Sequence, residues 1–156
     1  MKEKSRMVHT VKAVCDGEVI KLESVSDEVF SSGMLGKGFA IIPNGKDFVS
    51  PIDGRVTEAH EAGHAYAIAG NDGIEILVHI GIDTVELDGE GFAPVVKSGM
   101  SVSQCDKLTY ADTEKIIGRG FDPVTVVVIT NSEKMKDFKI NYGKVKAGDV
   151  VLEYAL

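Results

Sequence analysis

Cysteine and long apolar runs are both scarce in this sequence. Two cysteines, Cys15 and Cys105, are too few for a disulfide framework, and buried free thiols in a reducing cytosol are expected. The longest strongly apolar run, VTVVVI at 124–129, is far shorter than the roughly 20 residues that span a bilayer. The polar start MKEKSRMVHT lacks the apolar core of a secretion signal. We therefore expect a cytoplasmic chain that does not insert into a membrane.

Basic residues are also fewer than acidic ones. The chain has 17 Lys and Arg against 24 Asp and Glu, a formal net charge of −7. A nucleic-acid binder needs a basic face, so nucleic acid is not an expected partner. An acidic surface suits a protein partner whose docking residues are basic.

Short segments with β-branched residues, bounded by Gly, Asn and Asp, recur along the chain and predict strands. Because helical periodicity is rare, the pattern favours an all-β sandwich or barrel with at most short helices. One short helix is expected at DTEKIIGR, with Asp112 as its N-cap and Gly118 at its other end. The length predicts one domain over residues 10–156, preceded by a flexible tail at 1–9.

Two pairs of similar segments indicate an internal duplication. CDGEV at 15–19 resembles IDGRV at 52–56, and VSQCDKL at 102–108 resembles VKAGDVVL at 145–152. The spacing is irregular and each unit occurs twice, which favours a duplicated sandwich over a solenoid. Asp-Gly turns between strands are common, however, so the pairs carry information on the fold and none on function.

The stretch HAYAIA-GNDG-IEILVHI, residues 64–80, predicts a β-hairpin with a glycine-rich turn. With a four-residue loop His64 lies directly opposite His79, and with a two-residue turn the two are diagonal neighbours. Only a loop of odd length would place them on different faces. In either expected register Tyr66, Ile68 and Leu77 share the exposed face of the histidines, and the alanines of the first strand face the core.

Two adjacent imidazoles suit phosphoryl transfer, because a neutral histidine is a nucleophile and a second ring can stabilise the phosphoryl oxygens. Two other interpretations stay open at this point. The pair could be two half-exposed histidines of a sheet, or half of a zinc site completed by Asp83 or His60. A zinc hydrolase is disfavoured because H-E-x-x-H and C-x-x-C do not occur.

Several segments together resemble the glucose-type enzyme IIA domains of the phosphoenolpyruvate-dependent sugar phosphotransferase system. They occur in family order and cover nearly the whole chain from about residue 10. The matching segments are DEVFSSGMLGKGFAIIPNG (27–45), SPIDGRV (50–56), EAGHAYAI (61–68), LVHIGIDTVELDGEGF (77–92), KSGMSVSQCDKL (97–108) and VKAGDVVLEYAL (145–156).

This resemblance implies an antiparallel β-sandwich and a phosphocarrier that needs no cofactor. His64 would accept a phosphoryl group from the phosphocarrier HPr and pass it to a cysteine of enzyme IIB, while His79 would stabilise the group. The alternative is a regulatory module that binds target proteins through the same face, with a zinc ion bridging at His64 and His79. The implied docking surface comprises Asp27, Val29, Phe30, Met34, Leu35, Leu77, Asp83 and Val85.

The sequence departs from the family pattern at three positions. Ala62 replaces a frequent threonine whose hydroxyl can contact the histidine pair, and His60 replaces an apolar rim residue. Cys105 stands where Gly is favoured, at a turn that is expected to need a positive φ. Gly81 is expected to let backbone approach the histidines closely, and its neighbours are expected to orient an imidazole through a carbonyl.

Overall fold

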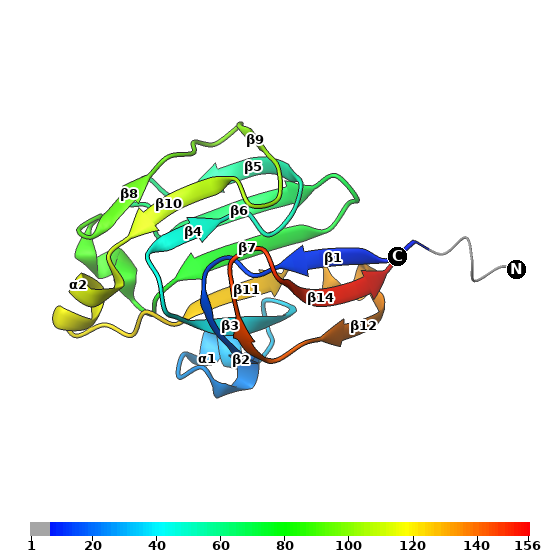
Figure 1. The fold of residues 1–156 in the computed structure, drawn as a ribbon, viewed down its shortest axis with the longest axis horizontal. Helices are drawn as coiled ribbons and strands as arrows, with labels where there is room; N and C mark the ends of the chain where they lie inside the picture. Colours follow the sequence, from blue (N-terminus) through cyan, green and yellow to red (C-terminus); the bar gives the residue numbers. More distant parts are fainter. Residues whose placement is uncertain (1–6) are drawn as a thin grey trace, which may run out of the picture.

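The predicted strands form an antiparallel β-sandwich in the computed structural model, which describes residues 7–156 (Figure 1). Within these residues the largest sheet has eight strands. In spatial order they are β13 (Gly143–Val145), β2 (Gly17–Lys21), β3 (Lys37–Pro43), β11 (Thr125–Ile129), β7 (Glu75–Ile80), β6 (Ala65–Gly70), β5 (Gly54–Ala59) and β9 (Ser101–Val102).

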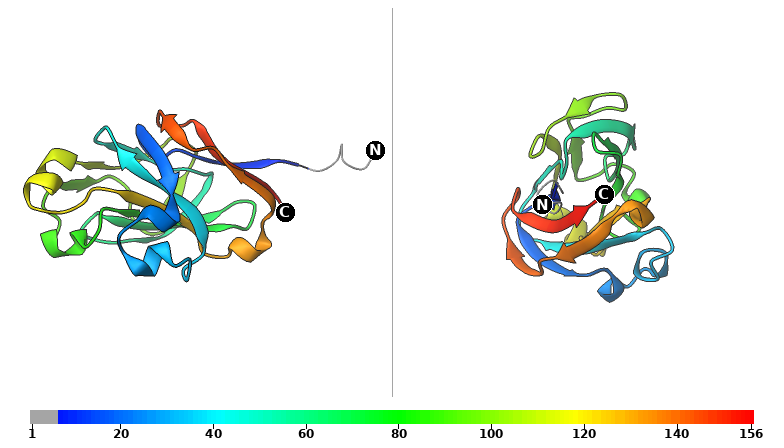
Figure 2. Two further views of the ribbon diagram at one scale, coloured as in Figure 1. Left: turned by 90° about the horizontal axis from the view of Figure 1, so that it is seen from below. Right: turned by 90° about the vertical axis from the view of Figure 1, so that its right-hand side faces the viewer.

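Two smaller sheets complete the sandwich. One contains β1 (His9–Lys12), β14 (Val150–Ala155) and β12 (Lys136–Ile140), and the other contains β4 (Asp47–Val49), β10 (Lys107–Ala111) and β8 (Phe92–Pro94). β1 and β14 run side by side in both figures (Figures 1 and 2). Among residues 7–156, no helix is long and apolar enough to cross a membrane.

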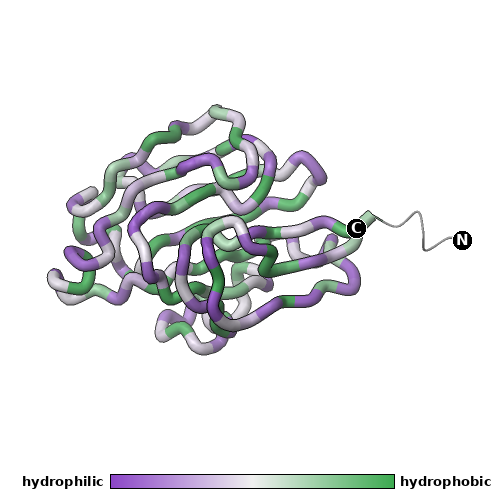
Figure 3. The backbone as a smooth tube through the Cα atoms, in the orientation of Figure 1, coloured by the Kyte–Doolittle hydropathy of each residue, from purple (hydrophilic) through white to green (hydrophobic). Residues whose placement is uncertain are grey.

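All five residues of the central strand β11 are buried, which explains why its sequence, TVVVI, shows no alternation of apolar and charged residues. Val127 and Ile129 belong to the main core, whereas Val126 and Val128 lie in a second cluster with Phe30 on the other face. A strand covered on both faces needs no polar alternation. β6 and β7, in contrast, alternate between more and less buried residues. Apolar and polar stretches are interspersed along the chain as a whole (Figure 3).

The predicted helix is present as α2 (Thr113–Gly118), and the Asp112 side chain accepts a hydrogen bond from Lys115 N, as expected of an N-cap. Gly118 is the last helical residue, as expected, and Arg119 follows as the C-cap. A second helix, α1 (Glu28–Ser31), was not expected, because four residues carry little periodicity. The short 3-10 helices are η2 (Leu22–Ser24), η3 (Thr84–Leu87) and η4 (Ser132–Lys134).

His9 is part of the domain, so the expected tail boundary at residue 9 is wrong. His9 pairs with Tyr154 in the β1–β14 ladder, and its ring stacks on the Tyr154 ring at 5.3 Å. Its Nδ1 lies 3.1 Å from the carboxylate of Asp72. The remainder of the expected tail, residues 1–6, falls outside the described residues.

The internal duplication is confirmed by matching hydrogen bonds in the two copies. Ala147 N donates to Asp16 Oδ1 in one copy, and Gln104 N donates to Asp53 Oδ1 in the other, both at 2.7–2.8 Å. Likewise Gly148 N donates to the Ala13 carbonyl and Cys105 N to the Ser50 carbonyl. The φ angles of Gly148 and Cys105 are 93° and 72°, so the expected positive φ at Cys105 is confirmed.

The register of the β6–β7 hairpin differs from both expected registers. Ala69 pairs with Glu75 and Ala65 with His79, which leaves a five-residue loop at 70–74. Gly70 N closes this loop by donating to the Ile74 carbonyl at 2.7 Å. An odd loop reverses the faces of β6. Tyr66 and Ile68 are therefore buried in the core, and the alanines share a face with Leu77 and His79.

Candidate functional site

His79 occupies the interior of the large sheet, between Val126 of β11 and Ala65 of β6. Its Nδ1 lies 2.8 Å from the carbonyl oxygen of Gly81. A carbonyl only accepts hydrogen bonds, so Nδ1 carries the proton of the neutral ring and Nε2 keeps a free lone pair. A backbone carbonyl thus orients an imidazole, but it belongs to Gly81 itself and not to a neighbour of Gly81 as the sequence predicted.

Gly81 can hold this carbonyl in place only as glycine. Its φ is 83°, and a Cβ at this position would lie 2.4 Å from Thr84 Cγ2. The buried Thr84 is itself fixed, because its Oγ1 donates to the Ile80 carbonyl at 2.6 Å. Sequence reasoning missed this supporting role of Thr84, although the residue stands within the IGIDTVEL segment.

His64 lies just before β6 and is only 3% exposed, so its expected position on an exposed face is wrong. Its carbonyl accepts a hydrogen bond from Ile80 N at 2.7 Å, and its ring stands 5.1 Å from that of His79 at 78°. Among the buried side-chain nitrogens and oxygens that the structure describes, only Nδ1 of His64 lacks a hydrogen-bond partner. The two rings therefore meet despite the odd hairpin loop.

The environment keeps both rings of this pair neutral near pH 7. Burial, together with smaller contributions from the neighbouring His79 and His60, lowers the pKa of His64 to about 4. Burial also lowers the pKa of His79, while the Gly81 carbonyl and the carboxylates of Asp27 and Asp83 act in the opposite direction. A neutral imidazole is the nucleophilic form.

A third imidazole adjoins the pair. The exposed ring of His60 lies 4.4 Å from the ring of His64, tilted by 53°. Its Nδ1 accepts a hydrogen bond from Ala62 N at 3.0 Å. His60 was expected near the site as a rim residue, and the structure places it in contact with His64.

Two phenylalanines border the histidines. The Phe30 ring lies 5.2 Å from His79, as expected of a residue in the docking set, and Phe92 lies 6.3 Å from His64. Phe30 is 7% exposed, so it forms the floor of the site more than its surface. Phe92 was not expected here, although it ends the segment that begins at Leu77.

The other expected docking residues fall into two groups. Leu35 and Leu77 are partly buried and pack with Phe30 in the second apolar cluster. Val29, Met34 and Val85 are exposed, by 47%, 72% and 51%, as a docking surface requires. Asp27 caps α1 by accepting from Val29 N, and Asp83 precedes η3 with a left-handed φ of 60°.

The site offers two imidazoles to a metal ion but no complete set of ligands. Among residues 7–156, no group of three His, Cys, Asp or Glu side chains could hold a metal ion. Neither His60 nor Asp83 therefore completes the zinc site that the sequence left open.

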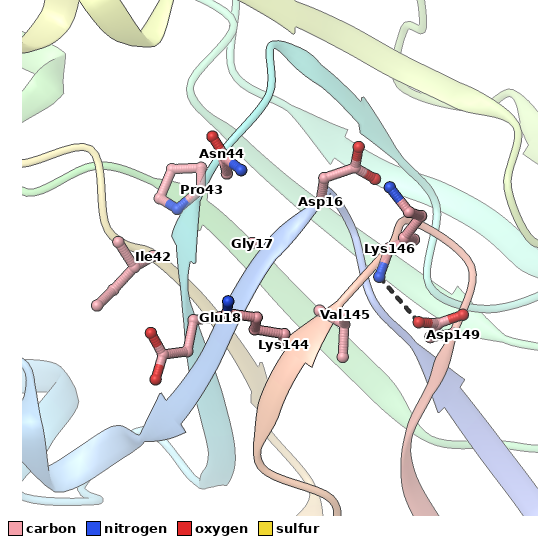
Figure 4. A pocket seen from close by; sticks show the side chains of 10 residues that line it. All are labelled: Asp16, Gly17, Glu18, Ile42, Pro43, Asn44, Lys144, Val145, Lys146 and Asp149. Carbon is pink, nitrogen blue, oxygen red and sulfur yellow. Dashed lines mark hydrogen bonds between the residues drawn. The ribbon is translucent and has the colours of Figure 1, made fainter.

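One hollow of the described surface lies away from the histidines. It has a volume of about 580 Å³ and lies between β2, β3 and β13, with none of the histidines in its lining (Figure 4). The backbone N–H of Lys146 donates to Asp149 across one side of it. This bond belongs to the duplicated turn.

Comparison with known proteins agrees with this geometry. Residues 9–135 match the family described as phosphoenolpyruvate-dependent sugar phosphotransferase system, EIIA 1. The chain is 41% identical to the glucose-specific EIIA component of Mycoplasma capricolum over 90% of this chain and 92% of that protein. It is 42% identical to the beta-glucoside-specific EIIBCA component of Bacillus subtilis over 87% of this chain, which matches 22% of that longer protein.

The solved structure of glucose permease IIA from Mycoplasma capricolum has the same fold. It superposes with a TM-score of 0.89 at 40% identity and covers 94% of this chain and 96% of that one. The sandwich, its internal duplication and the adjacent pair of His64 and His79 thus occur in a chain that matches this family over most of its length. The chain belongs to the EIIA 1 family of the phosphoenolpyruvate-dependent sugar phosphotransferase system.

Proposed function

We propose that this chain accepts a phosphoryl group from the phosphocarrier HPr on His79 and passes it to a cysteine of enzyme IIB. The family supports a phosphotransferase role, and the B and C components joined to EIIA in relatives support enzyme IIB as a partner. The acceptor differs from the one that the sequence resemblance implied. We assign acceptance to His79 and stabilisation of the phosphoryl group to His64.

The hydrogen bond from His79 Nδ1 to the Gly81 carbonyl carries this assignment. It fixes the tautomer whose lone pair is on Nε2, which is the arrangement that a histidine nucleophile needs. His64 has no partner on Nδ1 to fix a tautomer, and at 3% exposure it is less accessible to a partner than the partly exposed His79.

The transfer then follows from the positions of the protons. The Nε2 lone pair of His79 attacks phosphorus, and the P–N bond to the HPr histidine breaks with its electron pair returning to that ring. The Nδ1 proton of His79 stays on the ring, where the Gly81 carbonyl stabilises the positive charge that develops. In the second step a thiolate of enzyme IIB attacks phosphorus, and the electron pair of the broken P–N bond returns to Nε2.

His64 supports both steps as a hydrogen-bond donor. Its lowered pKa keeps it neutral, so it has one N–H to offer. A buried N–H without a partner is less favourable than a buried lone pair, so the proton belongs on Nε2 and Nδ1 stays bare. Removing one such donor typically costs about 3 kcal/mol of transition-state stabilisation.

The residues around His64 and His79 support the docking of HPr at this face. Val29, Met34 and Val85 supply exposed apolar area, and the carboxylates of Asp27 and Asp83 act on His79 electrostatically. Basic side chains around the active histidine of HPr would complement these carboxylates.

Phosphorylation by phosphoenolpyruvate, enzyme I and HPr, followed by intact-mass measurement, tests the assignment. His79→Gln should gain no phosphoryl group. His64→Gln should still be labelled but should transfer the group to enzyme IIB about 100-fold more slowly, as for loss of one stabilising donor. Labelling that survives His79→Gln and disappears in His64→Gln would restore the assignment implied by the sequence.

A further inference from the structure

We propose that His60 is a positioning residue of the phosphotransfer site. When His79 is phosphorylated, the Nε2–H of His60 donates to Nδ1 of His64 and fixes the tautomer of the His64 ring. The inference rests on the proposed function, because it concerns the phosphorylated state of the same site. It assigns a role to the imidazole that stands where an apolar rim residue is usual.

The first observation is the proton arrangement of His60. Its Nδ1 accepts the N–H of Ala62 at 3.0 Å, so in the neutral ring Nδ1 is bare and the proton is on Nε2. The donor is thus on the edge of the ring that the Ala62 contact leaves free. The turn that carries the ring is fixed, because His60 N donates to the Ala65 carbonyl and Gly63 N donates back to the His60 carbonyl.

The second observation is the unpartnered acceptor beside it. Nδ1 of His64 is buried without a hydrogen bond, and a buried polar atom in this condition requires an explanation. Ala62 has no hydroxyl that could reach it. The centroid of the exposed His60 ring lies 4.4 Å from that of His64, with the ring planes tilted by 53°, so a modest turn of the His60 ring would aim its Nε2–H at this atom.

The hydrogen bond from His60 to His64 should form when His79 carries a phosphoryl group. A phosphoryl oxygen on His79 would accept the Nε2–H of His64, whose ring stands 5.1 Å from that of His79. Donation at Nε2 polarises the imidazole and makes its Nδ1 a stronger acceptor, because chained hydrogen bonds strengthen one another. Three imidazoles would then form one chain, from His60 through His64 to the phosphoryl group.

Imidazole ¹⁵N chemical shifts, recorded before and after phosphorylation by phosphoenolpyruvate, enzyme I and HPr, test this chain. In the wild type, phosphorylation should move Nδ1 of His64 toward the shift of a hydrogen-bonded acceptor. His60→Phe keeps a ring but no donor, so this movement should vanish. The ratio of phosphorylated to unphosphorylated protein at equilibrium with HPr should fall about fivefold, as for one lost hydrogen bond.

His60→Gln, which retains an N–H donor, should restore most of both effects, and His9→Gln on the terminal strand is the matched control that should change neither. Circular dichroism checks that each variant is folded. Unchanged His64 shifts and an unchanged equilibrium in His60→Phe would overturn the inference while leaving the proposed function intact. A wild-type protein that gains no phosphoryl group on His79 would refute both.

Discussion

Acidification should destabilise this protein through His64. Burial lowers the pKa of this residue from its ordinary value of 6.5 to about 4 in the folded chain. Between these two pH values the unfolded chain binds a proton that the folded chain excludes. The free energy of unfolding therefore rises as the pH increases through this window, and it falls as the solution is acidified. From pH 7.5 to pH 5.0 the loss from His64 alone is about 2 kcal/mol.

Urea denaturation at a series of pH values, for the wild type and for His64→Gln, measures this loss. The variant lacks the titrating group, so its free energy of unfolding should fall by about 2 kcal/mol less than that of the wild type over the same range. The difference between the two proteins removes the contributions of the carboxylates. Parallel curves for the two proteins, or an NMR titration of His64 with a midpoint near 6.5, would refute the reasoning.

Three further substitutions test the site and the fold. Asp83→Asn keeps a residue that tolerates the left-handed φ but removes a charge, so transfer from HPr should slow at low salt and recover as salt screens the docking charges; a salt-independent loss would point to a structural role. Cys105→Gly should raise stability by about 0.5–1 kcal/mol in thermal unfolding, because relief of left-handed strain outweighs the added chain entropy; a lowered Tm would contradict this. Gly81→Ala should abolish labelling of His79 in the mass assay, because its Cβ meets Thr84 and displaces the carbonyl; normal labelling would show that the carbonyl is dispensable.

The sequence predicted the sandwich and most of its strands because alternation and glycine turns are local signals. It also predicted α2, whose Asp112 cap is a local feature. It did not predict α1, since one turn of helix is stabilised by the packing of Phe30 under the sheet and not by its own periodicity. Such tertiary stabilisation leaves no repeating pattern to read.

The hairpin shows where local reasoning failed. The GNDG segment suggested an even loop, but Ile74 joins the turn, and Asp72 Oδ1 accepts the N–H of Ile74 at 3.2 Å. The resulting five-residue loop sends Tyr66 into the core, where its hydroxyl donates to the Gly63 carbonyl. The histidines were correctly predicted to meet, but for a different reason: His64 reaches the site from the turn before β6, outside the regular pairing.

The roles within the pair also exceeded what the sequence alone could provide. A motif names two histidines but does not say which nitrogen carries a proton. The carbonyl of Gly81 and the lack of a hydrogen-bond partner at His64 Nδ1 bear on that question, and both depend on atoms placed by the fold.

The two duplicated turns have a consequence for the order in which the chain can fold. The copies are nested: the inner bond joins Asp53 to Gln104, 51 residues apart, whereas the outer bond joins Asp16 to Ala147, 131 residues apart. On a ribosome the inner copy can close while the outer one still lacks its second half. β1 must therefore wait for its partner β14 to be synthesised, and a pause near residue 140 would leave the backbone edge of β1 unpaired and open to aggregation.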